Sequence, residues 1–251
     1  MTLLDVDGLV KRFGGLLAID DLSLSVDDGE LVGVMGPNGA GKSTFFNCVS
    51  GVIHPDGGTV RFAGDNVTGV DTATLARDGL VRTFQHTRQL DTMTVRENVR
   101  LAAAKQPGER TVSALLRTDK MQKTEDEVTQ RADELIEMFE LTRLADEYAS
   151  SLSGGQRKLL ELARVLMLDP DLLLLDEPFA GVNPTLTNEI AAHIRDLNDD
   201  GMTVVVIEHE LETLTELVDR LVVLQQGSLL VEGDPETVLN DERVIDAYLG
   251  S

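Results

Sequence analysis

The apolar positions of the first part of the chain are spaced as in strands. Up to about residue 83, apolar runs of strand length alternate with turn signals such as DDG at 27–29, which indicates short strands separated by turns. The segment Lys42–Ser50 contains neither Gly nor Pro and is predicted to form a helix. The predicted strands are 3–10, 22–26, 30–36, 59–62 and 80–83.

Helical spacing replaces the strand pattern between about residues 94 and 168. Within 125–141, apolar residues recur every three or four positions with acids between them, as on the buried face of an amphipathic helix. These apolar residues are Val128, Ala132, Leu135, Ile136 and Phe139. Two more helices are predicted at 94–104 and 154–168, and the Pro, Gly and charges of 105–123 predict a loop.

Apolar runs of strand length return after this helical part. The predicted strands are 172–175, 203–207, 221–224 and 229–231, and a short helix is predicted for the tail at 241–250. The order therefore indicates an α/β core, a helical insertion and a return to the core.

Composition narrows the classes of protein. The chain has 251 residues and 42% hydrophobic residues, which suits one large globular α/β domain or two small ones. Its net charge of −22 argues against a general grip on nucleic acid, because binding phosphate backbones needs clustered cations. A single cysteine, Cys48, excludes an intrachain disulfide framework and a cysteine-based zinc site. No secretory signal is seen, and no apolar run approaches the roughly 18 residues of a membrane span, so we expect a cytosolic protein that can dock on a membrane protein.

The acidity also predicts origin in a halophile, with an ordinary acidic protein as the alternative. At molar salt the Debye length falls to about 3 Å, so repulsion among surface carboxylates is screened. We therefore expect the melting temperature to rise between dilute and molar KCl, measured by differential scanning calorimetry. A melting temperature that does not rise with KCl would contradict the halophile interpretation.

A glycine-rich sequence follows the apolar run LVGVM. Residues 36–44 read GPNGAGKST and fit the phosphate-loop pattern, in which glycines let backbone N–H groups approach phosphate oxygens. The helix that follows places its positive end at the same point. Lys42 is expected to neutralise the β- and γ-phosphates, and the Ser43 hydroxyl to bind Mg²⁺. The predicted binding residues are Gly36, Pro37, Asn38, Gly39, Ala40, Gly41, Lys42, Ser43 and Thr44.

Two adjacent acids end the apolar run at 172–175. In open α/β sheets, ligands bind at the carboxyl ends of parallel strands. Together with the phosphate loop, this placement predicts that Asp176 holds Mg²⁺ through water and that Glu177 orients or deprotonates the attacking water.

The segment SLSGGQRK at 151–158 opens a second helix with small residues and glycines. Such a helix start can bind an anion, but one nucleotide does not need two phosphate-binding helix starts in the same chain. The set GPNGAGKST, Gln85, LSGGQ, LLLLDEP and His209, in this order, resembles the ATP-binding cassette (ABC) ATPases over nearly the whole chain. The resemblance implies a dimer that encloses two ATP molecules. In it, Ser153, Gly154, Gly155 and Gln156 of one subunit contact the γ-phosphate held by the other subunit.

Other roles carry over from the same resemblance. Gln85 matches the family glutamine that binds Mg²⁺ or the attacking water, and His209 matches the histidine that contacts the γ-phosphate. Phe13 matches the aromatic residue that stacks on adenine. Asn183 stands where an Asp is usual in the wider family. This difference implies either weaker coupling across the dimer or membership of a subgroup of the family.

The resemblance also implies a fold. It is an α/β P-loop NTPase core, with a mixed or parallel sheet and flanking helices, plus an antiparallel β subdomain and an inserted α-helical subdomain. The expected single ABC ATPase domain spans 1–251. Its core and β subdomain are expected at 1–85 and 165–251, and the helical insertion with the signature motif at 86–164.

Several stretches resemble one branch of the family, the ATP-binding subunits of branched-chain (hydrophobic) amino acid importers. They are KRFGGLLAIDDLSLSV, RTFQHTRQLDTMTVRENV, LLLLDEPFAGVNP, IEHE and VIDAYLG. This resemblance implies membrane-spanning permease subunits, a second ATPase subunit, an extracellular solute-binding protein acting indirectly, and a place on the cytoplasmic face of the membrane. SLSGG departs from the branch, since many members carry Tyr as its third residue.

Three alternatives compete with this interpretation. DEPFAG and SLSGG also resemble the ATPase of lipid or lipopolysaccharide exporters. A soluble ABC protein of DNA repair, chromosome structure or translation is disfavoured by the lack of long heptad repeats, by the single cassette and by the acidity. A P-loop kinase or GTPase would leave LSGGQ without a role.

Overall fold

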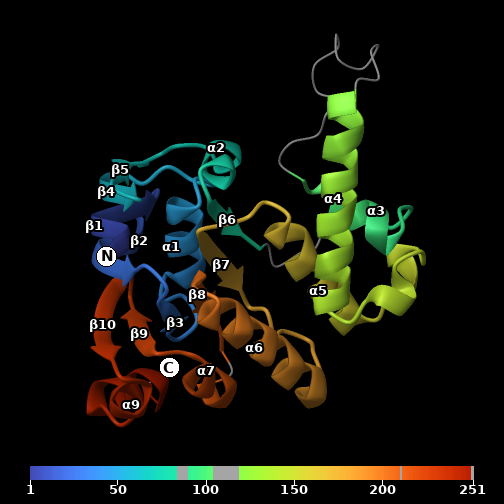
Figure 1. Cartoon of the computed structure of the whole chain (residues 1–251). Coiled ribbons are helices and arrows are strands. Elements are labelled where there is room, and N and C mark those ends of the chain that lie inside the picture. Colours follow the sequence, from blue (N-terminus) through green and yellow to red (C-terminus); the bar gives the residue numbers. More distant parts are fainter. Residues whose placement is uncertain (84–89, 104–118, 210, 250–251) are drawn as a thin grey trace. The chain divides into compact units, whose positions relative to one another are not determined.

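The computed structural model describes residues 1–83, 90–103, 119–209 and 211–249, with the side chains of 119–122 and 249 left out. Contacts divide the chain into two compact units. The first comprises Met1–Gln85, Pro170–Ala180 and Pro184–Ser251, and the second His86–Asp169 and Gly181–Asn183. Figure 1 labels the helices and strands of both units.

A six-stranded sheet forms the centre of the first unit, in the order β10-β9-β3-β8-β7-β6. All neighbours are parallel except β10, which runs antiparallel to β9. The strands are β3 (Leu31–Met35), β6 (Leu80–Arg82), β7 (Leu172–Asp176), β8 (Thr203–Ile207), β9 (Arg220–Gln225) and β10 (Ser228–Gly233). β3, β7 and β8 are buried along their whole length, which explains why their sequences are unbroken apolar runs.

Alternate residues of this sheet face two different layers. A methyl group built on Gly33 would meet Leu214 and Val218, so α7 (Leu211–Leu217) packs on one face of β3. Val32 and Val34 point the other way, into a core shared with α1 (Lys42–Val49) and a second sheet. Phe45 and Cys48 of α1 lie in that core. The other helices of this unit are α2 (Thr72–Arg77), α6 (Pro184–Asp199), α8 (Pro235–Leu239) and α9 (Glu242–Leu249).

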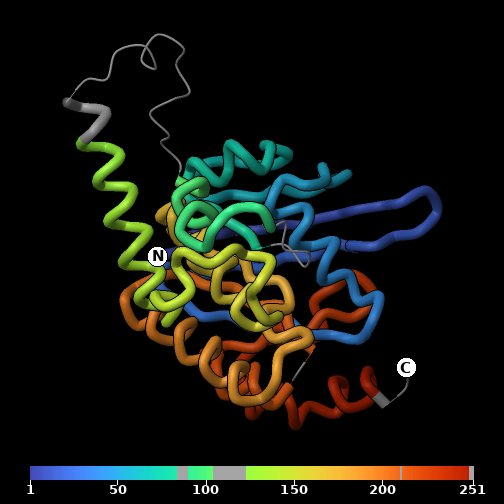
Figure 2. The backbone as a smooth tube through the Cα atoms, turned by 90° about the vertical axis from the view of Figure 1, so that its right-hand side faces the viewer, coloured from blue at the N-terminus to red at the C-terminus, as the bar shows by residue number. Residues whose placement is uncertain are grey.

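The second sheet is antiparallel, in the order β2-β1-β4-β5. Its strands are β1 (Thr2–Phe13), β2 (Leu16–Asp27), β4 (Gly57–Phe62) and β5 (Asp65–Asn66). β1 and β2 are far longer than the predicted segments 3–10 and 22–26. Gly8 and Asp21 adopt positive φ where the register between β1 and β2 shifts, so irregularities bend the two strands without ending them. The hairpin projects as the blue loop in Figure 2.

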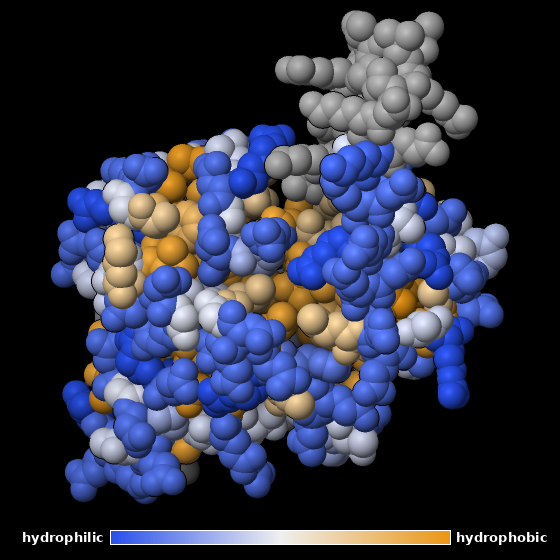
Figure 3. Space-filling view, viewed as in Figure 1, coloured by the Kyte–Doolittle hydropathy of each residue, from blue (hydrophilic) through white to orange (hydrophobic). Residues whose placement is uncertain are grey.

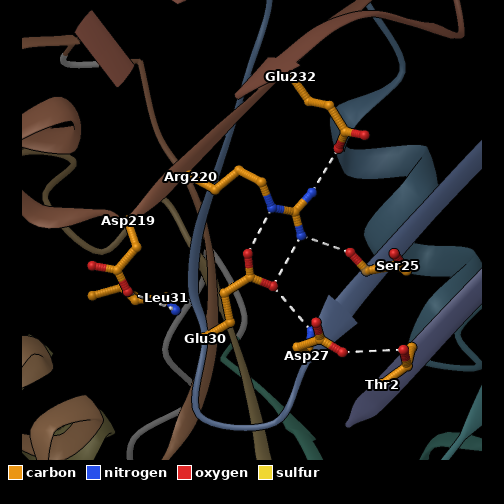
Figure 4. A network of polar contacts seen from close by, with 8 residues as sticks. All are labelled: Thr2, Ser25, Asp27, Glu30, Leu31, Asp219, Arg220 and Glu232. Carbon is orange, nitrogen blue, oxygen red and sulfur yellow. Dashed lines mark hydrogen bonds and ion pairs between the residues drawn. The ribbon is translucent and has the colours of Figure 1, made fainter. Parts of the chain in front are cut away.

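A polar network joins the two sheets at the amino end of β3 (Figure 4). The Arg220 guanidinium donates to both carboxylate oxygens of Glu30, at 2.6 and 2.9 Å, to Glu232 at 2.6 Å and to the Ser25 carbonyl at 2.7 Å. Hydrogen bonding to Glu30 raises the pKa of Arg220 above its usual value. The network holds β9 of one sheet against β2 of the other.

The second unit is helical. Its elements are α3 (Val95–Leu101), α4 (Asp119–Met138), two 3₁₀ turns η1 (Thr142–Leu144) and η2 (Ala149–Ser151), and α5 (Gly154–Leu166). Ala132, Leu135, Ile136 and Phe139 are buried, which confirms this part of the predicted apolar face; Val128 is half-buried. The predicted loop at 105–123 is wrong from Asp119 onward, because α4 begins there; residues 104–118 lie outside the described residues.

Hydrophilic side chains predominate on the face of the molecule shown in Figure 3, as the composition leads one to expect. Among the helices that the structure describes, none is both long and apolar enough to cross a bilayer.

Candidate functional site

The phosphate-loop sequence connects β3 to α1 and fits its place only because of its glycines. A side chain on Gly36 would lie 2.2 Å from the Leu224 carbonyl oxygen of β9. Gly41 has φ +105°, and a side chain there would lie 2.7 Å from the Ala18 carbonyl oxygen of β2. The loop therefore packs against strands of both sheets. Because glycines have no side chain, a ligand could approach the backbone of the loop closely.

The helix start after this loop has backbone N–H donors that the helix itself does not use. The Phe45 N–H donates to the Gly41 carbonyl oxygen at 2.8 Å, so the N–H groups of the preceding turn have no carbonyl four residues back within the helix. Such a helix start binds phosphate groups. Ser43 is exposed on this turn and Thr44 is half-buried.

Lys42 is 6% exposed and lies over the loop. Its Nζ donates to the Gly36 carbonyl at 2.6 Å and to the Pro37 carbonyl at 3.2 Å. Burial lowers the pKa of Lys42, while the charges of Glu177 and Asp176 act to raise it. The ammonium group thus lies between the phosphate loop and the two acids.

The ends of β7 and β8 bring Glu177 and His209 together. Asp176 is paired with Ile207 in the sheet, and the Glu177 N–H donates to the Ile207 carbonyl at 2.9 Å. Glu177 has φ +51°, a left-handed conformation that turns the chain sharply after the strand. Its Oε1 lies 3.0 Å from His209 Nε2. A carboxylate and an imidazole therefore face each other at the carboxyl edge of the sheet.

Asp176 is 3% exposed and is held by Arg82 of β6. Its Oδ2 accepts a hydrogen bond from Arg82 Nη2 at 2.7 Å, and its N–H donates to the Thr83 hydroxyl at 3.2 Å. Its other oxygen, Oδ1, is buried and accepts no hydrogen bond from the residues that the structure describes. An unsatisfied carboxylate oxygen beside a phosphate loop fits a site for Mg²⁺ or its water ligands.

Glu208 is a residue of this edge that the sequence reasoning missed. It is 3% exposed. Its Oε1 accepts from the Phe179 N–H at 2.7 Å and its Oε2 from the His209 N–H at 3.0 Å. One buried carboxylate therefore fixes both the turn that carries Glu177 and the residue His209. A Glu directly after the apolar run TVVVI was the available signal.

Replacing Glu208 by Gln should disturb both chain segments, because an amide NH₂ would face one of the two backbone N–H donors. We expect the free energy of unfolding to fall by about 1.5–3 kcal/mol, as for a hydrogen bond to a charged group. We also expect kcat for ATP to fall by roughly tenfold or more, since Glu177 and His209 would shift. Urea denaturation and steady-state kinetics measure the two effects, with exposed Glu236→Gln as the control. Normal kcat in a destabilised Glu208→Gln protein would refute the positioning role.

Phe13 ends β1 and is half exposed. Lys11 Nζ lies 5.5 Å from the centre of its ring, which is within the range of a cation–π contact. Phe13 is paired with Leu16, two residues before Ala18, whose carbonyl oxygen borders Gly41. The hairpin tip is thus on the strand pair that borders the phosphate loop.

The tail of the first unit also contacts the loop. The Gly36 N–H forms a hydrogen bond to the phenol oxygen of Tyr248 in α9, and burial raises the pKa of this phenol. The sequence reasoning assigned no role to Tyr248.

The signature residues lie in the second unit, at the start of α5. Ser153 is the N-cap. Its hydroxyl accepts from the Gln156 N–H at 3.3 Å, and Gln156 Oε1 accepts from the Ser153 N–H at 2.9 Å. Both side chains are therefore engaged in a capping box. Gln85 lies outside the described residues.

Comparison with known proteins decides what this arrangement is. The sequence model of the family described as "ABC transporter" matches residues 19–180. The chain belongs to this family. It is an ATP-hydrolysing, ATP-binding cassette. A second family model, described as "Branched-chain amino acid ATP-binding cassette transporter", matches residues 228–251, the part of the cassette that includes Tyr248.

Curated relatives match the cassette over nearly its full length. The high-affinity branched-chain amino acid transport ATP-binding protein BraF of Pseudomonas aeruginosa is 39% identical, over 99% of this chain and 98% of its own. The corresponding protein LivG of Escherichia coli K12 is 41% identical with the same coverage.

Solved cassettes share the fold. The ADP conformation of an ATP-binding cassette of an ABC transporter has a TM-score of 0.87 and 38% identity, and all of both chains is covered. A dimeric cassette in a post-hydrolysis state bound to ADP and phosphate has a TM-score of 0.76 and 27% identity, over 93% of this chain and 99% of that one. These similarities confirm the predicted α/β fold class.

Proposed function

We propose that this cassette powers import of branched-chain or other hydrophobic amino acids. The proposal rests on similarity to branched-chain amino acid transport proteins. The chain is about 40% identical to BraF and LivG over nearly its whole length, and the branched-chain family model matches residues 228–251. We place the protein on the cytoplasmic face of the cell membrane, bound to membrane-spanning permease subunits. An extracellular solute-binding protein would supply the amino acid indirectly.

The site supports direct hydrolysis of the γ-phosphate by water. Glu177 acts as general base or orients the water, and His209, 3.0 Å from it, contacts the γ-phosphate. Lys42 and the N–H groups of the phosphate loop bind the β- and γ-phosphates. Phe13 stacks on the adenine.

Ser43, Gln85 and Asp176 are the residues that would hold Mg²⁺. Once bound with ATP, Mg²⁺ would neutralise charge on the phosphates and polarise them as a Lewis acid. For Asp176 the oxygen that would face Mg²⁺ or its water ligand is Oδ1, since Oδ2 is already paired with Arg82.

We further propose that the working form is a dimer with a second ATPase subunit, either identical or related. Ser153, Gly154, Gly155 and Gln156 of one subunit would contact the γ-phosphate bound by the other. The capping box occupies the backbone N–H groups of Ser153 and Gln156, so the Gly154 and Gly155 N–H groups and the Ser153 hydroxyl proton would contact the phosphate. Similarity to a dimeric cassette with ADP and phosphate supports this arrangement.

A tagged pull-down from native membranes at high KCl tests the transport proposal, with the partners identified by mass spectrometry. We expect two polytopic membrane proteins, a second short ATPase and an amino-acid-binding protein. Membrane partners of a lipid or lipopolysaccharide exporter would overturn the amino acid substrate. Soluble partners alone would overturn the transport role.

A further inference from the structure

Arg82 is a buried cation that none of the roles above uses. Its side chain is 5% exposed, and the carboxylate of its partner Asp176 is 2% exposed. A buried charged pair costs desolvation free energy that apolar residues of the same volume avoid. Stability alone therefore does not explain the Arg82–Asp176 pair, which points to a functional role.

The Arg82 guanidinium contacts two different elements at once. Nη2 donates to Asp176 Oδ2 at 2.7 Å, at the end of β7. Nη1 donates to Asn47 Oδ1 at 2.7 Å and to the Ser50 hydroxyl at 3.1 Å. Asn47 lies in the last turn of α1, and Ser50 is the C-cap of this helix. The guanidinium also lies 5.4 Å from the centre of the Phe46 ring.

These contacts fix one oxygen of Asp176 and leave the other for a ligand. Oδ2 is held by Arg82, so the carboxylate cannot rotate without breaking a buried ion pair. Oδ1 is buried and accepts no hydrogen bond from any described residue. Because α1 begins with Lys42 and Ser43, the same guanidinium also holds the helix of the phosphate loop against the strand of Asp176.

We propose that Arg82 is a positioning residue for the metal site: it aims Asp176 Oδ1 at the Mg²⁺ that accompanies ATP and fixes the distance from Asp176 to α1. The inference rests on the proposed Mg²⁺ role of Asp176. Partners that orient metal-binding carboxylates change metal affinity or activity by about 10- to 100-fold when removed.

The test compares Arg82→Met, Arg82→Lys and the unaltered protein. The first readout is binding of ATPγS, measured by competition with a fluorescent nucleotide, in excess Mg²⁺ and in EDTA. We expect Arg82→Met to keep its affinity in EDTA and to lose about tenfold or more of the gain that Mg²⁺ gives. In Arg82→Lys, the gain in affinity from Mg²⁺ should lie between the gains of Arg82→Met and of the unaltered protein, since one ammonium group cannot bridge Asp176 and α1 as a guanidinium does. The second readout is the half-saturating Mg²⁺ concentration for hydrolysis, which should rise about 10- to 100-fold in Arg82→Met.

Arg220→Met is the matched control. Arg220 is also paired with a carboxylate, at the opposite, amino end of the same sheet, and its side chain is 22% exposed against 5% for Arg82. Its loss should lower the melting temperature without changing the Mg²⁺ dependence. A normal Mg²⁺ gain in Arg82→Met, or an equal loss in Arg220→Met, would overturn the inference. If the unaltered protein itself gains nothing from Mg²⁺, the proposed metal site fails instead, and the two failures are thus distinguishable.

Discussion

Glu177→Gln should bind ATP normally and hydrolyse it at least a hundredfold more slowly, within the roughly 10²–10⁴-fold that a general base contributes. Glutamine keeps the length of the side chain and an acceptor oxygen but cannot take a proton from water. The variant should also trap the closed dimer with two ATP molecules. Single-turnover kinetics and size-exclusion chromatography with ATP measure the two effects.

Glu140→Gln is the control for this experiment. Glu140 is exposed, and its backbone has φ +56°, close to the +51° of Glu177, so the same substitution is made in the same backbone conformation. We expect normal hydrolysis. Turnover of Glu177→Gln within a few-fold of normal would remove Glu177 from the catalytic role.

Lys42→Ala should weaken ATP binding and hydrolysis together. Nζ is held over the phosphate loop by the Gly36 and Pro37 carbonyls, so its charge lies where the proposed binding of the β- and γ-phosphates needs it. A hydrogen bond to a charged group is worth about 1.5–3 kcal/mol, which corresponds to about 10- to 150-fold in affinity. Equilibrium binding of ATPγS and steady-state hydrolysis measure the effect.

Lys123→Ala removes an exposed lysine from α4 and should change neither quantity. Lys42→Arg separates charge from shape: the wider guanidinium has little room in a position 6% exposed, so we expect most of the loss to persist. If Lys42→Ala bound ATP with unchanged affinity, the loop would not be the phosphate site.

The sequence was most informative where local pattern and chemistry coincide. β7 and β8 were predictable because strands covered on both faces need unbroken apolar runs, and the phosphate loop because its glycines are a local steric requirement. Helix α6 also carried a readable signal in the spacing of Ile190 and Ile194, but it was not predicted.

Other parts depend on contacts that no local pattern records. Arg82 and Asp176 are 94 positions apart, and a strand of three residues gave no reason to pair them. The partners of Glu208 are backbone N–H groups. Because almost every residue has one, no residue type in the sequence marks these partners. The length of β2 was underestimated because the predicted strand began after Asp21, which is a bend within β2 and not its end. The predicted first strand ended at Val10, before the charged Lys11 and Arg12, which continue the pairing with β2.

The place of β3 in its sheet has a consequence for biosynthesis. Both of its neighbours, β8 and β9, come late in the chain, since β3 ends at Met35 while β8 begins at Thr203 and β9 at Arg220. At ribosomal rates of about 5–20 residues per second, β3 waits roughly 10–30 s with both edges unpaired. A nascent chain of this kind exposes a fully apolar strand to other nascent chains. We therefore expect the folding yield of this cassette to depend more on chaperones that bind nascent chains than does the yield of a domain whose early strands pair with each other.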